Sequence, residues 1–151
     1  YIPALEPNPA MEWTNLAADS HYKTAERIRA ELDSGNLNEA RQGIEELLEA
    51  MGRSDRRALK SQLIRLMAHV IKWKSQPERR SQSWAITILH ARREIEAIRE
   101  DTPSLGERAV QEMWSQCLAL ALEEAEAEMG RHSLLGELSR EEVFSERYVL
   151  S

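Results

Sequence analysis

The fold class is decided by one stretch of the chain, residues 59–73, which reads LKSQLIRLMAHVIKW. Its apolar side chains recur every three or four residues, as expected for one face of an α-helix; they are Leu59, Leu63, Leu66, Met67, Val70 and Trp73. Ser54 precedes the stretch and can cap the helix, and Pro77 follows it and cannot continue the helix. The pattern therefore predicts a helix over residues 55–75.

Similar patterns on the N-terminal side predict helices over residues 16–34 and 39–51. Gly35 and Gly52 stand where each helix needs a stop, and Asn38 can cap the second. The apolar face of the second helix is expected to comprise Ala40, Ile44, Leu47, Leu48 and Met51. Residues 1–13 carry three of the five prolines and no periodicity, so we expect an extended arm there.

On the C-terminal side, a fourth helix is expected to begin near Ser81 or Ser83. A long fifth helix is expected from Thr102 and Pro103 to about residue 129, with Gly130 as its stop. Ser139 and Glu142 have the spacing of a capping box, which predicts a short sixth helix followed by a tail. Together these patterns predict an all-α, single-domain bundle of five to six helices over residues 14–151.

Length and composition exclude several classes of protein. The chain has 151 residues, which suits one domain, and its single cysteine excludes a disulfide framework and a multi-cysteine metal site. The longest apolar run is six residues, 117–122, whereas a membrane-spanning helix needs about 20. We therefore expect no membrane segment and a cytoplasmic location.

The charge is divided along the chain. Residues 53–93 carry 11 Lys and Arg against 2 Asp and Glu, whereas the segments before and after them have net charges of −6 and −9. One interpretation is that the acidic helices neutralise the basic segment within the protein. The other is a basic face that binds nucleic acid or another anionic partner.

No catalytic signature is present in the sequence. Neither GxGxxG nor GxxxxGK[ST] nor HExxH occurs, and no histidine has a glutamate three residues before it, as a di-iron helical bundle requires. We expect a buried, inert Cys117, no catalytic residue, no metal site and no cofactor. His69 is expected to be structural, with a proton-transfer or ligand-binding role as the alternative.

The densest local pattern is KWKSQPERRSQSW, residues 72–84, in which two tryptophans flank a turn rich in basic residues. It predicts a corner between two helices, with its arginines on helix-end carbonyls or on carboxylates. The alternative is an anion or nucleic-acid site in which Lys72, Arg79 and Arg80 meet phosphate and the tryptophans stack on bases.

Several motifs in order resemble the bacterial domain-of-unknown-function family number 29. They are EAMGRSDRRAL at 49–59, then His69, Lys72-Trp73, QPERRSQSW at 76–84, Thr87-Ile88, Arg92-Arg93 and Thr102-Pro103-Ser104-Leu105. The resemblance extends over residues 44–105 and implies an all-helical fold with no established activity. Ser75 and Leu47 depart from it, since an aromatic residue and a glutamate are common at those two places.

The resemblance also indicates which polar residues form a ligand-binding site, if the chain has one. Together with the basic corner it points to Arg57, His69, Lys72, Gln76, Arg79, Arg80 and Arg92. The preferred hypothesis is nevertheless a non-enzymatic protein that binds a protein partner or itself, with nucleic-acid or anion binding as the alternative. A homodimer is expected to use the fifth helix, where Trp114 and Leu118 widen the apolar face.

Overall fold

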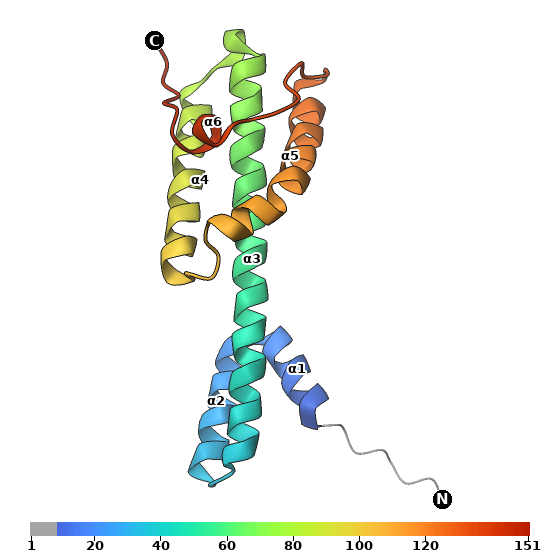
Figure 1. The fold of residues 1–151 in the computed structure, drawn as a ribbon, viewed down its shortest axis with the longest axis vertical. Helices are drawn as coiled ribbons and strands as arrows, with labels where there is room; N and C mark the ends of the chain where they lie inside the picture. Colours follow the sequence, from blue (N-terminus) through green and yellow to red (C-terminus); the bar gives the residue numbers. More distant parts are fainter. Residues whose placement is uncertain (1–8) are drawn as a thin grey trace, which may run out of the picture. The chain divides into compact units, whose positions relative to one another are not determined.

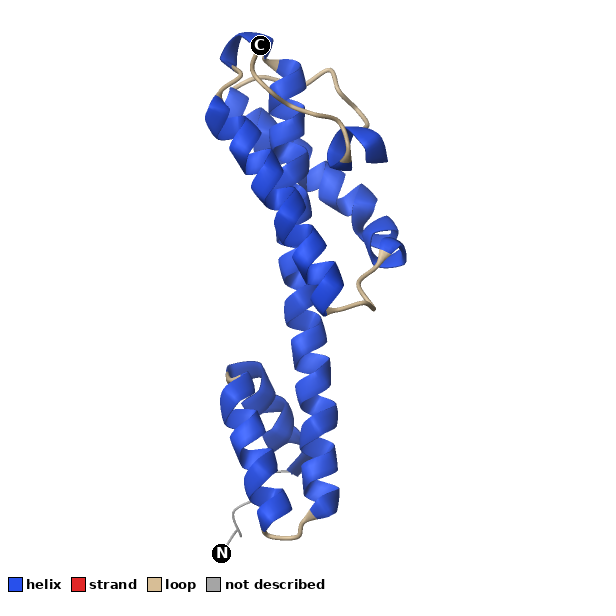
Figure 2. Ribbon diagram, turned by 90° about the vertical axis from the view of Figure 1, so that its left-hand side faces the viewer, coloured by secondary structure: helices blue, strands red, loops and turns tan. Residues whose placement is uncertain are grey.

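The computed structural model describes residues 9–151, and every regular element in that range is helical (Figure 2). The elements are α1 (Pro9–Asp19), α2 (His21–Asp33), α3 (Leu37–Ser75), the 3₁₀ turn η1 (Pro77–Arg79), α4 (Gln82–Asp101), α5 (Glu107–Met129) and α6 (Arg140–Phe144). The prediction of an all-α chain with five to six helices is confirmed. No helix within residues 9–151 is long and apolar enough to cross a membrane.

These helices group into two compact units, Tyr1–Ser54 and Asp55–Ser151, which we call the N-terminal and C-terminal units. Helix α3 contributes its first half to one unit and its second half to the other. Each unit has its own apolar cluster. The expectation that residues 14–151 act as a single domain stays a prediction.

In the N-terminal unit, α1 and α2 lie beside the first half of α3 (Figure 1). The core is small and centres on Trp13, which is 1% exposed and contacts Ile28 and Ala40 in the same cluster. The indole Nε1–H of Trp13 donates to Glu39 over 2.9 Å, so its polar edge is satisfied as well. One aromatic side chain thus joins the three helices of this unit.

Two predictions about the first two helices of this unit are wrong. Residues 9–13 of the expected arm belong to α1, in which Pro9 suits the first turn and Trp13 is buried; the rest of the arm lies outside the described residues. The expected helix 16–34 is two helices. Ser20 is extended between them, and its hydroxyl accepts from the N–H of Lys23 to cap α2.

Helix α3 runs unbroken through the predicted stop at Gly52 and the predicted cap at Ser54, so both of those predictions are wrong. A glycine in a helix interior costs only about 1 kcal/mol of stability. Where no proline follows, the stability gained by continuing a long helix is larger than this cost. The Glu49–Arg53 pair, 3.8 Å apart and one turn apart in sequence, spans the glycine.

In the C-terminal unit, α4 and α5 lie on either side of the second half of α3, and α6 lies over the same end (Figure 1). All six residues of the apolar stripe in residues 59–73 are buried, as predicted. They pack against α4 and α5 through Ile88, Ala91, Ile95, Val110 and Met113. Cys117 is buried in this cluster, and burial raises the pKa of its thiol.

The predicted caps of this unit are confirmed at three of four places. Ser81 caps α4, the left-handed Gly130 ends α5, and Ser139 with Glu142 forms the capping box of α6. The start of α5 is predicted wrongly. Thr102 instead ends α4 and donates its hydroxyl hydrogen to Asp55 over 2.6 Å, so α5 begins after Gly106.

Candidate functional site

The residues predicted to form a ligand site do not all meet. Lys72, Gln76 and Arg80 lie where the end of α3 and the start of α4 come together, in the C-terminal unit, whereas Arg92 lies in the middle of α4 and binds α6. Arg57 lies on α3, 18 residues before the last residue of that helix, Ser75, which is about 27 Å along the helix. Arg57 and Arg79 are exposed and make no ion pair within residues 9–151.

Lys72 is bound within the protein. Its side chain is 7% exposed, its ammonium group donates to Glu128 of α5, and it lies 5.2 Å from the ring centroid of Trp84. A buried ammonium group held by a carboxylate and an aromatic face links α3, α4 and α5. Its partners in this structure are therefore structural ones.

Arg80 closes the end of α3. Its Nε–H donates to the carbonyl of Trp73 over 2.8 Å, and its guanidinium lies 5.1 Å from the centroid of the Trp73 ring. A cation at the C-terminus of a helix satisfies a free carbonyl and matches the helix dipole. Gln76 is buried, and its backbone N–H donates to the carbonyl of Lys72 over 2.9 Å.

His69 lies half buried on α3, and its Nδ1–H donates to the carbonyl of Arg65 over 2.8 Å. Burial, the largest effect, lowers the pKa of the imidazole below its ordinary value, so the neutral form prevails at pH 7. His69 lines neither of the two large grooves of this unit. Its surroundings fit the structural role expected for it.

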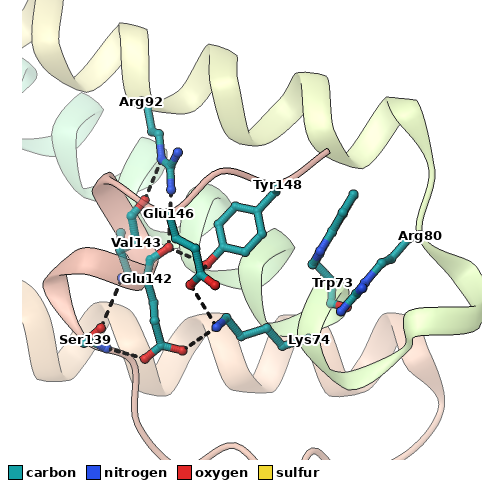
Figure 3. A network of polar contacts seen from close by, with 9 residues as sticks. All are labelled: Trp73, Lys74, Arg80, Arg92, Ser139, Glu142, Val143, Glu146 and Tyr148. Atoms are coloured by element: carbon teal, nitrogen blue, oxygen red, sulfur yellow. Dashed lines mark hydrogen bonds and ion pairs between the residues drawn. The ribbon is translucent and has the colours of Figure 1, made fainter. Parts of the chain in front are cut away.

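Arg92 belongs to a network of polar contacts that we call the C-terminal latch: Lys74, Arg92, Glu142, Glu146 and Tyr148 (Figure 3). The guanidinium of Arg92 donates to the backbone carbonyls of Val143 and Glu142, over 2.8 and 3.3 Å. The hydroxyl of Tyr148 donates to the Glu142 carbonyl over 2.6 Å. These bonds fasten α6 and the tail after it to α4.

Lys74 fastens the same segment to α3. Its ammonium group lies 2.8 Å from Glu142 and 3.0 Å from Glu146 (Figure 3). The hydrogen bonds from Lys74 lower the pKa of both carboxyl groups, so both stay ionised at pH 7. Burial lowers the pKa of Lys74, but the two carboxylates outweigh it and raise the pKa overall. Burial is also the main reason that the pKa of Tyr148 is raised.

Sequence reasoning did not identify Lys74 and the carboxylates of the latch as residues that interact. Lys74 stands inside the basic corner, but its partners Glu142 and Glu146 come 68 and 72 residues later in the chain. Only the capping box gave a signal for Glu142. A long-range pair of this kind leaves no periodic trace in a sequence.

The basic segment 53–93 is partly neutralised by acidic flanks. Arg53, Arg56, Lys72 and Lys74 pair with carboxylates that lie outside the segment. Arg80 and Arg92 bind backbone carbonyls instead. Within residues 9–151, five further basic side chains of the segment have no ion pair: Arg57, Lys60, Arg65, Arg79 and Arg93.

Two grooves open on the C-terminal unit beside Arg92. The larger, of about 620 Å³, lies between α4, the turn after it and α6, and carries both arginine and glutamate side chains. The smaller, of about 250 Å³, lies between α4 and the tail. No group of three or more His, Cys, Asp and Glu side chains able to hold a metal ion occurs in the part of the chain that the structure describes.

The N-terminal unit leaves a row of apolar side chains uncovered. We call Leu37, Ile44, Leu48 and Met51 of α3 the apolar row; Leu37 and Leu48 are 64% exposed and the other two 43%. Ile44, Leu48 and Met51 belong to the apolar face that the sequence predicts, but this part of the face is exposed. The small core contacts only the neighbouring side of the helix, at Ala40 and the partly buried Leu47.

Comparison with models of protein families gives a match over most of the chain. A family model described as "Domain of unknown function DUF29" matches residues 13–149. No curated protein matches, and no solved structure matches.

Proposed function

Because that match covers nearly the whole chain, the protein belongs to the family of the domain of unknown function DUF29, and we propose that it is a non-enzymatic protein that associates with a second copy of itself. The family's description names no activity, so the proposal depends on the surface of this chain. The observation that carries it is the apolar row on α3.

The spacing of the apolar row matches helix pairing. Leu37, Ile44, Leu48 and Met51 follow one another at steps of seven, four and three residues, the a and d spacing at which two helices pack side by side. Scattered single apolar residues on a surface are ordinary, but a continuous row along one helix indicates a contact surface. Ala40 and Leu47 form the core side of the same helix, so the row is not needed to fold its own unit.

The charges beside the row favour a second copy over a partner of one sign. Arg41, Glu45, Glu49 and Arg53 give this half of α3 charges of both signs, and Glu49 with Arg53 is already an ion pair. A rim of a single sign would repel its own copy, whereas a mixed rim is compatible with itself. Pairing through the same patch on both copies gives a closed, two-fold dimer.

The test is the mass of the purified chain as a function of concentration. In sedimentation velocity from about 5 to 200 μM, spanning the range of a weak dimer, we expect the mass to rise from the 17.3 kDa of one chain toward twice that value. Leu48→Glu should hold it at 17.3 kDa, because it places a carboxylate in the middle of the row.

The matched control is Leu134→Glu, the same change at a leucine that is fully exposed outside the row. It should leave the concentration dependence unchanged, while circular dichroism shows that both variants keep their helices. A wild-type chain that stays monomeric throughout, or equal losses for both variants, would refute self-association through the row.

Nucleic-acid or anion binding is the second candidate, and the five basic residues without an ion pair are its support. The neutralised remainder of the segment argues against a continuous basic face. Binding of a labelled oligonucleotide at about 50 mM salt that weakens steeply with added salt, and in the Arg79→Ala and Arg80→Ala variants, would favour it. The cytoplasmic location stays a prediction.

A further inference from the structure

The smaller groove of the C-terminal unit differs from the rest of this surface in chemistry. We call it the α4 groove; it is lined by Ala85, Ile86, Ile88, Leu89 and Arg92 of α4 and by Arg147, Tyr148 and Val149 of the tail. Six of these eight residues are apolar or aromatic, two are arginines, and none is acidic. A concave apolar surface with few polar groups is the usual form of a binding site.

Exposed apolar side chains line the groove and continue beyond it. Ile86 and Val149, which line the groove, are 50% and 64% exposed, and Leu89 also lines it. Leu150 follows Val149 in the tail and is also exposed. Large apolar side chains from two separate segments thus meet at one place on the surface, which is typical of an interaction site rather than of scattered exposure.

The charge at the groove is positive, and its two arginines are not paired with carboxylates. Arg147 is exposed and has no ion pair within residues 9–151. Arg92 donates hydrogen bonds to neutral carbonyl groups and lies over the ring of Tyr148, so no carboxylate is hydrogen-bonded to it. The nearby carboxylates of Glu142 and Glu146 are both held by Lys74. A ligand with carboxylates would therefore meet two arginines without displacing an existing ion pair.

The tail also offers main-chain partners. Residues 147–151 form no regular structure, and in the described part of the chain their backbone N–H and C=O groups make no backbone hydrogen bond. The latch nevertheless holds the tail in place, through the contacts of Tyr148 and Arg92 (Figure 3). An extended peptide can bind such a segment by main-chain hydrogen bonds, with its side chains in the adjoining pocket.

From these observations we propose that the α4 groove binds an extended segment of a partner protein in which a large apolar side chain lies next to aspartate or glutamate. The apolar side chain fills the space between Leu89 and Val149, and the carboxylates meet Arg92 and Arg147. This site lies in the C-terminal unit and does not depend on self-association through the apolar row.

The experiment uses a phage-displayed library of random ten-residue peptides, selected on the intact chain. We expect enriched peptides to combine leucine, isoleucine, valine or phenylalanine with aspartate or glutamate. Synthetic copies with a fluorescent label then give binding curves by anisotropy. Leu89→Ala and Arg147→Glu should each weaken binding about tenfold or more, as expected at a binding hot spot.

Each variant has a matched control at an exposed residue outside the groove. Leu134→Ala and Arg79→Glu should leave affinity unchanged, and so should Leu48→Glu in the apolar row. The proposal is overturned if enriched peptides lack acidic residues, if none is enriched, or if the controls weaken binding as much as the groove variants. It is also overturned if a labelled oligonucleotide binds with the same dependence on Arg147, or if Leu89→Ala abolishes self-association.

Discussion

Two glycines inside α3 should respond to the same substitution with opposite sign. Helix propensity alone predicts that Gly→Ala stabilises an interior helical position by about 0.8–1.0 kcal/mol. At Gly52 a methyl group would meet no atom within 4 Å, so we expect that gain in full. At Gly43 the methyl group would lie 2.7 Å from Ile28 and 2.7 Å from two ring carbons of Trp13.

The surroundings of Gly43 cannot give way easily. Trp13 is 1% exposed and its indole N–H is bonded to Glu39, so its ring is fixed on both sides. Overpacking a core typically costs about 1–3 kcal/mol. Over most of that range the cost is larger than the gain in helix propensity. We therefore expect Gly43→Ala to destabilise the N-terminal unit by up to about 2 kcal/mol, the difference between those two terms.

The assay is urea unfolding of each variant, followed by circular dichroism at 222 nm and by tryptophan fluorescence. Trp13 is the only tryptophan of the N-terminal unit, and a chain in which the other three tryptophans are replaced by phenylalanine would report that unit alone. A Gly43→Ala variant as stable as Gly52→Ala, or more so, would refute the close packing of Trp13 on α3.

Two further predictions concern buried and partly buried ion pairs. Glu128→Gln should destabilise the C-terminal unit by about 1–3 kcal/mol, because the ammonium group of Lys72 stays buried without its carboxylate. Lys72→Met removes the charge and keeps the volume, so it should reduce the free energy of unfolding by less in the same urea assay. If Lys72→Met is the more harmful variant, the desolvation argument fails. The latch should also open in acid. The pKa of Glu142 in the folded protein lies below its ordinary value of 4.5. The stability that Glu142 gives to the latch is therefore present above pH 4.5 and is lost as the pH falls through the folded-state pKa. Amide NMR signals of the tail should follow this loss, and in Lys74→Met it should be much smaller; an identical titration in that variant would exclude Lys74 as the cause.

Much of the helical architecture could be predicted because its signals are local. Apolar spacing in residues 59–73 placed the central helix, and Ser81, Gly130 and the Ser139–Glu142 box placed later caps correctly. Each of these depends on residues within one or two turns of one another. The errors at Gly52 and Thr102 share one cause, since a residue able to stop or cap a helix does so only where no better interaction is available.

The candidate site could be predicted only in part, because a residue's type does not show where its partner lies. The resemblance pointed to Arg80 and Arg92, and both bind carbonyls of the chain itself. Lys74 was not selected, although it holds two carboxylates. The apolar surfaces were misplaced for the same reason: the surplus expected at Trp114 is partly covered by Phe144 and Arg140, while Leu48 is left exposed.

The sequence by itself determined the helical class, because an apolar period of 3.6 residues and the residue types at helix ends act through neighbours along the chain. Only the tertiary structure decided which apolar faces are buried and which basic residues are neutralised. Those outcomes depend on which helices lie against one another, and contacts such as Lys72 with Glu128 or Lys74 with Glu146 join residues 56 and 72 positions apart. The exposed row of α3 and the groove beside α4 are therefore properties of the packing.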